Sequence, residues 1–172
     1  QIAIWTGIPS HGKSEMLDYI AVRLAVMHDW KTLFFSPENY PVENHYAKIA
    51  EKLIGKPFKE SDMSRDEFDT VFDYIESHFF WLDPYEDPTL ENVLSRAKQF
   101  IQRKGIKQVV MDPFNCMEHK RDRSETGSEY VGRFLDECSR FTKRYGILGH
   151  LVAHPTKLEK MQGGIYPPPT LY

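Results

Sequence analysis

Short apolar runs recur along the chain, separated by longer stretches in which apolar residues recur every three or four positions among polar ones. The runs predict five β-strands, over residues 2–6, 32–36, 79–82, 108–111 and 148–154. These strands are apolar almost throughout, so both of their faces must be covered. The pattern therefore predicts a sheet with helices packed on either side.

The stretches between the runs carry apolar residues at the spacing of amphipathic helices. They predict helices over residues 13–28, 41–54, 64–78 and 87–104, and a last one from residue 126. Ser64 and Glu67 form a capping box, and Pro88 suits the first position of its helix. Strands that alternate with helices predict one α/β domain over residues 1–172, with a mostly parallel sheet of about five strands. Residues 155–172 are expected to form a loop.

Composition narrows the classes of function. The chain has 172 residues, one ordinary domain, and a net charge of −3, which excludes a globally basic nucleic-acid coat. It has no apolar run long enough to span a membrane, and Cys116 and Cys138 make neither a disulfide framework nor a zinc site. We expect a cytoplasmic protein of bacterial or phage origin, with an organellar one as the alternative. Both ends look unnatural, so we expect a fragment of a longer protein.

The clearest chemical motif runs from Gly7 to Ser14 and matches G-x-x-x-x-G-K-[ST] between a strand and a helix. Its glycines let successive backbone N–H groups face a phosphate, and the helix N-terminus adds positive charge. Lys13 would reach the β- and γ-phosphates, and the Ser14 hydroxyl would ligate Mg²⁺. The motif predicts binding of ATP or another NTP with Mg²⁺. The predicted nucleotide-binding residues are Gly7, Ile8, Pro9, Ser10, His11, Gly12, Lys13, Ser14 and Glu15.

Acidic residues follow two of the predicted strands. Asp112 ends an apolar strand in the Walker B manner and would hold Mg²⁺, unless it is only a solvated strand-end aspartate. Pro113 follows it where many P-loop ATPases have a catalytic glutamate, so the base must come from elsewhere. Glu38 lies just after the second strand, on the same rim as the P-loop, and is the candidate base for the attacking water. A capping or surface glutamate is the alternative.

His154 ends the fifth strand on the same rim. A polar side chain there could sense the γ-phosphate and pass the signal to the next loop, so His154 joins Lys13 and Glu38 as a predicted catalytic residue. The alternative is a histidine with a purely structural partner. His45, His78 and His150 have no metal-ligand spacing, and we expect them at the edge of the core or on the surface.

Together these motifs resemble the RecA-like motor domain of the DnaB and Twinkle replicative helicases, most of all primase–helicases with an upstream toprim module. The matching stretches are residues 6–15, 35–39, 111–115 and 151–157. The resemblance implies a RecA-like P-loop NTPase fold and a hexameric ring that moves 5′ to 3′ on single-stranded DNA by hydrolysing NTP. It also implies that Glu38 is the catalytic base and that His154 takes the place of a glutamine.

In that family, the loops after the Walker B and sensor strands point into the ring channel. The corresponding residues here, predicted to bind DNA, are Lys120, Arg121, Arg123 and Lys157. A basic cluster in an acidic chain suits contact with a phosphate backbone, although a solvated flexible loop is an equal alternative. The family's arginine finger lies downstream of the sensor strand, so we expect the finger and the fused or associated primase module outside this chain.

Two other classes of protein share part of this pattern. A RecA-like strand-exchange or clock-type ATPase would use the same site mainly for assembly. A small-molecule kinase shares the P-loop, and the Arg121–Arg123 cluster could mimic its arginine-rich lid. The position of Glu38 and the absence of a predicted lid helix favour the helicase motor over the kinase.

Overall fold

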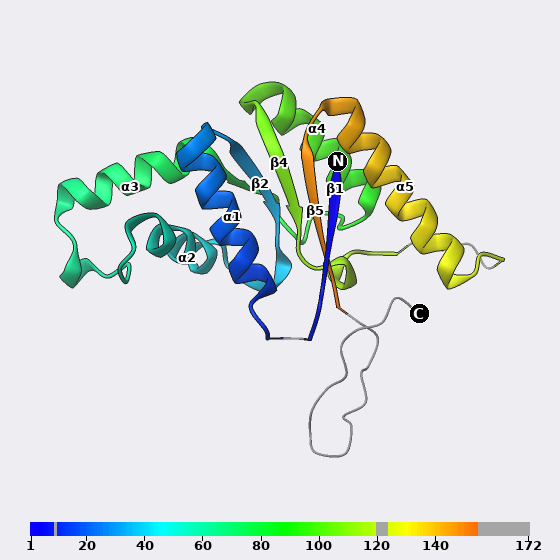
Figure 1. The fold of residues 1–172 in the computed structure, drawn as a ribbon, viewed down its shortest axis with the longest axis horizontal. Helices are drawn as coiled ribbons and strands as arrows, with labels where there is room; N and C mark the ends of the chain where they lie inside the picture. Colours follow the sequence, from blue (N-terminus) through cyan, green and yellow to red (C-terminus); the bar gives the residue numbers. More distant parts are fainter. Residues whose placement is uncertain (9, 120–123, 155–172) are drawn as a thin grey trace, which may run out of the picture.

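A computed structural model of the protein describes residues 1–8, 10–119 and 124–154. Five parallel strands pair in the order β1-β5-β4-β2-β3, with helices on both faces (Figure 1). The strands are β1 (Ile2–Thr6), β2 (Lys31–Phe35), β3 (Phe79–Trp81), β4 (Ile106–Met111) and β5 (Leu148–Ala153). The α-helices are α1 (Lys13–His28), α2 (Val42–Ile54), α3 (Arg65–His78), α4 (Leu90–Lys104) and α5 (Gly127–Tyr145). Short 3₁₀ turns are η1 (Pro37–Asn39), η2 (Glu60–Asp62) and η3 (Phe114–Cys116). The predicted α/β class and parallel sheet are confirmed.

The strands divide their side chains between two cores. In β2, Leu33 and Phe35 pack with α4 and α5 on one face of the sheet, whereas Phe34 packs with α1, α2 and α3 on the other. All three side chains are fully buried. Successive residues of a strand point to opposite faces, so a run that is apolar at every position can only be buried between two layers of helices.

The strand order places β5 between β1 and β4. Leu151 of β5 pairs with Ile4 on one side and with Met111 on the other. The last residues of these strands therefore meet at one edge of the sheet, at the bottom of Figure 1. This edge receives the segments that follow β1, β2, β4 and β5, where the predicted chemistry lies.

The helix boundaries follow local capping. The capping box of Ser64 and Glu67 opens α3 as predicted. The start of α4 is wrong in the sequence-based prediction: Thr89, not Asp87, is the N-cap, and its hydroxyl accepts the N–H of Asn92 at 3.4 Å. Pro88 stays outside the helix because its carbonyl accepts the N–H of Glu118 at 3.0 Å, which ties this segment to the chain after η3. Within the described ranges, no helix is long and apolar enough to cross a membrane.

Two histidines are more deeply buried than the sequence suggested. His45 and His150 lie in the interior, so their expected place at the core edge or surface is wrong, whereas His78 lies at the core edge, where it contacts the exposed Asp29 at 2.8 Å. The indole N–H of Trp81 donates to Nδ1 of His45 at 2.9 Å, and that of Trp5 donates to Nδ1 of His150 at 3.1 Å. Burial lowers the pKa of His150 to about 4, so this ring is neutral at pH 7. An indole partner makes it possible to bury an imidazole that sequence composition places outside.

Two glycines offer an opposite pair of stability tests. A Cβ on Gly149 of β5 would lie 2.8 Å from Cγ2 of the buried Thr142, a side chain too short and stiff to yield. A Cβ on Gly132, inside α5, would meet nothing within 4 Å. We expect Gly149→Ala to lower the free energy of unfolding by about 1–3 kcal/mol. We expect Gly132→Ala to raise it by roughly 0.5–1 kcal/mol. Urea unfolding of both variants measures these changes. If both substitutions changed the free energy of unfolding in the same direction, the packing described for Gly149 and Gly132 would be contradicted.

Candidate functional site

The loop between β1 and α1 curls around a lysine. The ammonium group of Lys13 donates to the carbonyl oxygens of Gly7 and Ile8, each at 3.0 Å. Gly12 has a φ of 78° and Ser10 a φ of 63°, both in the left-handed region that turns the chain sharply. The lysine therefore already lies inside the concave side of the loop, where a phosphate group would meet it.

The N-terminus of α1 is open, unlike those of α3 and α5. Gly12 caps it without a side-chain hydrogen bond, whereas Ser64 and Thr126 begin α3 and α5 with complete capping boxes. The first N–H groups of a helix need acceptors, and here the sequence supplies none from its own cap. An anion at this end would satisfy them and gain from the helix dipole.

Three further polar side chains meet the P-loop at this edge. Glu38 follows β2 in η1, Asp112 follows β4, and His154 follows β5. Nε2 of His154 lies 3.3 Å from Oε1 of Glu38, across 116 positions of sequence. The backbone N–H of Asp112 donates to the carbonyl of Phe35 at 2.9 Å, which fixes its height relative to β2. The edge thus gathers the residues that the sequence placed in catalytic and metal-binding roles.

Asp112 is a buried carboxylate with little compensation. Burial raises its pKa, and the charge of Glu38 adds to this, whereas a hydrogen bond from Ser14 and the proximity of His154 lower it. Its Oδ1 atom has no hydrogen-bond partner among the described residues. Such an unpaired acceptor beside the Ser14 hydroxyl fits a divalent cation. No three His, Cys, Asp or Glu side chains of the described ranges form a metal cluster, so the other ligands would be water and phosphate oxygens.

Two features of this edge of the sheet were not predicted from the sequence. Oδ1 of Asn115 accepts the backbone N–H of His154 at 3.1 Å and so links η3 to the end of β5. The pKa of the Cys116 thiol is raised by its partial burial and by the charges of Glu38 and Asp112. Asn115 lies within a stretch already recognised as a motif, but only the pairing of β4 with β5 shows what its amide contacts.

The remaining predicted residues are placed as follows. The carboxylate of Glu15 turns away from the loop and contacts Lys52 of α2 at 2.6 Å, so a contact with nucleotide would come from its backbone. His11 is exposed on the loop. Five predicted site residues lie outside the described residues: Pro9, Lys120, Arg121, Arg123 and Lys157.

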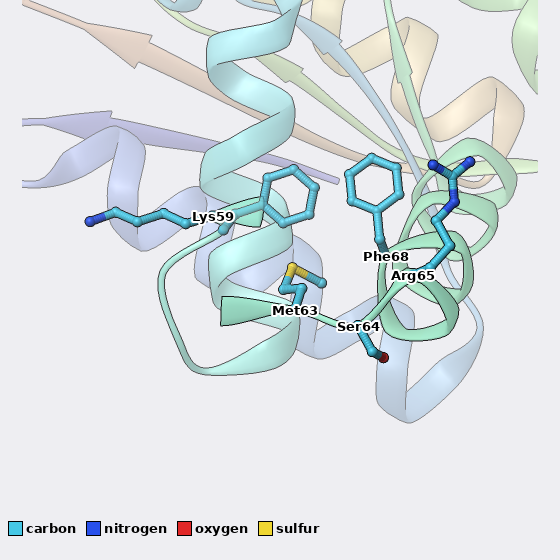
Figure 2. A pocket seen from close by; sticks show the side chains of 6 residues that line it. Lys59, Met63, Ser64, Arg65 and Phe68 are labelled. Carbon is cyan, nitrogen blue, oxygen red and sulfur yellow. The ribbon is translucent and has the colours of Figure 1, made fainter. Parts of the chain in front are cut away.

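A hollow elsewhere in the protein, of about 490 Å³, lies between the end of α2 and the start of α3. The rings of Phe58 and Phe68 stack in it with centroids 5.5 Å apart. Figure 2 shows Phe68 among the side chains that line the hollow. Two of its polar lining residues are already engaged: Ser64 belongs to the capping box and Arg65 pairs with Asp69 at 3.2 Å. It carries none of the predicted site residues and plays no part in the candidate site.

Comparison with known families places this edge in context. Residues 1–160 match the family described as the AAA domain. The chain belongs to the AAA domain family. Membership implies nucleotide binding, in agreement with the lysine-centred loop and the open start of α1.

Two proteins that are longer than this chain are similar to it. The Twinkle homolog protein, chloroplastic/mitochondrial, of Arabidopsis thaliana is 35% identical over 181 residues, which cover 100% of this chain and 25% of the relative. A structure of a DnaB-like replicative helicase and its interactions with primase has a TM-score of 0.67 at 14% identity, covering 91% of this chain and 40% of the other. The chain thus spans a quarter to two-fifths of these proteins. The resemblance to DnaB and Twinkle and the RecA-like fold are confirmed.

The buried charge of Asp112 makes a testable demand on stability. A raised pKa means that the folded state holds the carboxyl proton more tightly than the unfolded chain, whose pKa is near 3.8. Stability is therefore lost as pH rises through the raised value. We expect Asp112→Asn, without ligand, to melt higher than the unmutated protein at pH 7, by roughly 2–4 °C for each kcal/mol gained. This gain in melting temperature should disappear when the pH falls below the ordinary aspartate pKa, near 3.8.

Thermal unfolding between pH 3.5 and 8 measures this. The exposed Asp136 of α5 supplies the control, since Asp136→Asn removes a carboxylate that is open to solvent. A gain in melting temperature of equal size in both variants would show that net charge, not the burial of Asp112, is responsible.

Proposed function

We propose that this chain is the ATP-hydrolysing motor domain of a replicative DNA helicase. In this role it uses ATP, or another NTP, to move on single-stranded DNA and to separate the duplex. The contact of 3.3 Å between Glu38 and His154, on the edge that carries Lys13, is the observation that carries the proposal. It joins a candidate base and a candidate phosphate sensor in one site. The names of the Twinkle and DnaB-like relatives supply the class of motor.

Nucleotide binding follows from the groups around the P-loop. The Lys13 ammonium and the open N–H groups of α1 would hold the β- and γ-phosphates. Ser14 and Asp112 would hold Mg²⁺, whose charge offsets that of the phosphates when it is bound. The Ser14 side chain lowers the pKa of the Asp112 carboxyl, and this proximity of the two groups supports the pairing.

In hydrolysis, Glu38 would act as the general base. Its carboxylate would accept a proton from a water molecule while the water oxygen bonds to the γ-phosphorus and the bond to the β-bridging oxygen breaks, which releases ADP and phosphate. Pro113 occupies the position after Asp112 and has no proton-accepting side chain. Glu38 lies across the edge from it, next to His154. The second carboxylate of the site therefore comes from β2 rather than β4.

Coupling to DNA is supported by the link between Asn115 and His154. In the sequence, Asn115 lies a few residues before Lys120, Arg121 and Arg123. His154 lies a few residues before Lys157. Since the Asn115 side chain holds the backbone of His154 at 3.1 Å, a shift of His154 on γ-phosphate loss would move both segments together. These two segments are the proposed DNA-contacting loops of the motor.

The proposed assembly is a hexameric ring with a fused or associated primase module. The primase module is supported by the DnaB-like neighbour, whose structure is described together with its interactions with primase, and the ring stays a prediction from the family resemblance. A cytoplasmic location stays a prediction. The Arabidopsis relative carries a chloroplastic and mitochondrial name, which keeps the organellar alternative in place.

Hydrolysis by the full-length protein, with and without single-stranded DNA, tests the function. We expect Glu38→Gln to bind nucleotide within about threefold of the unmutated protein and to hydrolyse it at least about 100-fold more slowly, because the amide cannot accept the proton. The exposed Glu43 of α2 gives a matched control, and Glu43→Gln should hydrolyse normally.

The pattern of activities separates the candidate functions. Stimulation by single strands together with duplex unwinding supports the helicase motor. Stimulation without unwinding favours a RecA-like or clock-type ATPase, and ADP release that depends on a metabolite favours a kinase. Normal hydrolysis by Glu38→Gln would show that another group is the base.

DNA binding by the basic cluster makes a second prediction. Neutralising Lys120, Arg121 and Arg123 removes charges that would displace counterions from the DNA backbone. We expect weaker binding and a salt dependence whose log–log slope is smaller by roughly 2, at about 0.7 for each contact with a single strand. Fluorescence anisotropy at several salt concentrations measures both. Neutralising three exposed cations elsewhere, Lys98, Arg103 and Lys107, is the control, and equal effects of the two triple variants would remove the cluster from the interface.

A further inference from the structure

The segment that carries Glu38 is short and has few internal restraints. Glu38 is the middle residue of η1, a single 3₁₀ turn whose N-cap Ser36 makes no side-chain capping bond. The next residue, Asn39, holds the turn instead: its amide donates to Oγ of Ser36 at 2.9 Å. Two backbone bonds close the turn, from the Asn39 N–H to the Ser36 carbonyl at 3.2 Å and from the Tyr40 N–H to the Pro37 carbonyl at 3.3 Å, and the Asn39 side chain adds the side-chain link that fixes the turn against Ser36.

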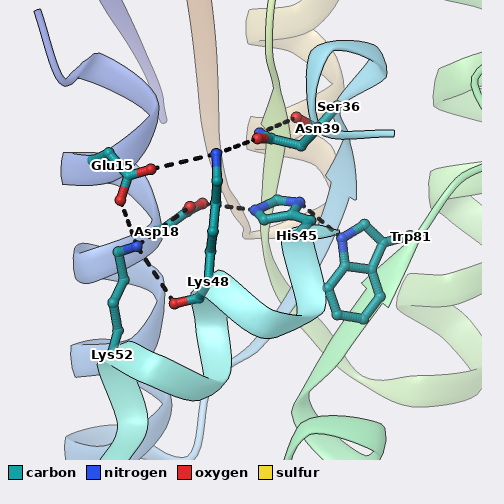
Figure 3. A network of polar contacts seen from close by, with 8 residues as sticks. All are labelled: Glu15, Asp18, Ser36, Asn39, His45, Lys48, Lys52 and Trp81. Carbon is teal, nitrogen blue, oxygen red and sulfur yellow. Dashed lines mark hydrogen bonds and ion pairs between the residues drawn. The ribbon is translucent and has the colours of Figure 1, made fainter. Parts of the chain in front are cut away.

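Lys48 of α2 sets that orientation. Its ammonium group donates to Oδ1 of Asn39 at 2.9 Å, which leaves the Asn39 amide nitrogen directed at Ser36 (Figure 3). The same ammonium lies 3.4 Å from Oε1 of Glu15, the residue after Ser14 in the P-loop. In Figure 3, Lys48 stands between α1 and η1 and touches both. One side chain thus connects the Glu38 turn to the start of the nucleotide-binding helix.

Other contacts hold α2 in place independently of Lys48. Lys52, one turn further along α2, contacts the other oxygen of Glu15 at 2.6 Å. The Trp81 indole donates to Nδ1 of His45, so Nε2 of His45 carries the proton and donates to Asp18 of α1 at 2.9 Å. Asp18 and His45 are both buried, so this link is shielded from water. The packing of α1 on α2 does not need Lys48, and among the described side chains of α2 it is Lys48 that donates to Asn39.

We infer that Lys48 is a positioning residue for Glu38. Lys48 keeps the η1 turn in register with the P-loop, so that the Glu38 carboxylate faces the site where the γ-phosphate would lie. The inference rests on the proposed function, in which Glu38 is the base. A base displaced by a fraction of an ångström loses much of its effect, whereas phosphate binding at Lys13 does not involve η1. The Lys48–Glu15 pair is half-exposed and contributes little by itself, so the bond to Asn39 carries the effect.

Steady-state hydrolysis by the full-length protein tests this with two matched variants. We expect Lys48→Met to lower kcat about 10-fold and to leave the Kd for a non-hydrolysable ATP analogue within about twofold. Lys52→Met removes the shorter contact with Glu15 but none with Asn39, so its kcat should stay within about twofold even where its melting temperature falls. Lys48→Arg, which keeps a donor at this position, should recover part of the lost kcat.

A double-mutant cycle shows the route of the effect. Asn39→Ala should lower kcat as Lys48→Met does, and the double variant should be no slower than the slower single variant, because both changes break one connection. A normal kcat in Lys48→Met, equal losses in Lys48→Met and Lys52→Met, or multiplicative losses in the cycle would each overturn the inference. Glu38→Gln keeps the two proposals apart: if that variant is inactive while Lys48→Met is normal, the base assignment stands and the positioning role alone fails. If the unmutated protein does not hydrolyse nucleotide, or Glu38→Gln hydrolyses normally, both fail.

Discussion

The parallel pairing of all five strands is the constraint on which the candidate site depends. It sends the chain leaving β1, β2, β4 and β5 to the same edge, so that Lys13, Glu38, Asp112 and His154 arrive there without being near one another in sequence. Within this edge, the pairing of Leu151 with both Ile4 and Met111 inserts β5 between the P-loop strand and the Walker B strand. A group that follows β5 therefore lies between the groups that follow β1 and those that follow β4.

The same edge concentrates polar groups that folding leaves incompletely satisfied. Oδ1 of Asp112 and Nδ1 of His154 are buried without hydrogen-bond partners in the described structure. An unmatched buried acceptor or donor costs about 1–3 kcal/mol. Proteins tolerate such costs at functional sites because a ligand supplies the missing partners. Around this edge the cores are apolar and closely packed, and α3 and α5 begin with complete capping boxes.

The sequence-based predictions succeeded where local rules act alone and failed where distant segments compete. The capping box at Ser64 is a contact over three residues and was predicted correctly. The start of α4 was misplaced because Pro88 is drawn into a bond with Glu118, thirty positions away. The burial of His45 was not predicted, because the indole that pairs with it belongs to Trp81 in β3, a different element of the fold. No spacing rule links Lys48 to Asn39, since one is on α2 and the other in the turn before it.

The sequence by itself determined the strand and helix pattern, the parallel α/β class and the lysine-containing phosphate loop. These depend on periodicity and on glycine conformations that neighbouring residues set. Only the tertiary structure decided that β5 lies between β1 and β4, that the imidazole of His154 meets the carboxylate of Glu38, and that Lys48 connects η1 to α1. Each of these depends on strand order and on side chains from separate elements, and no local pattern encodes which strand pairs with which.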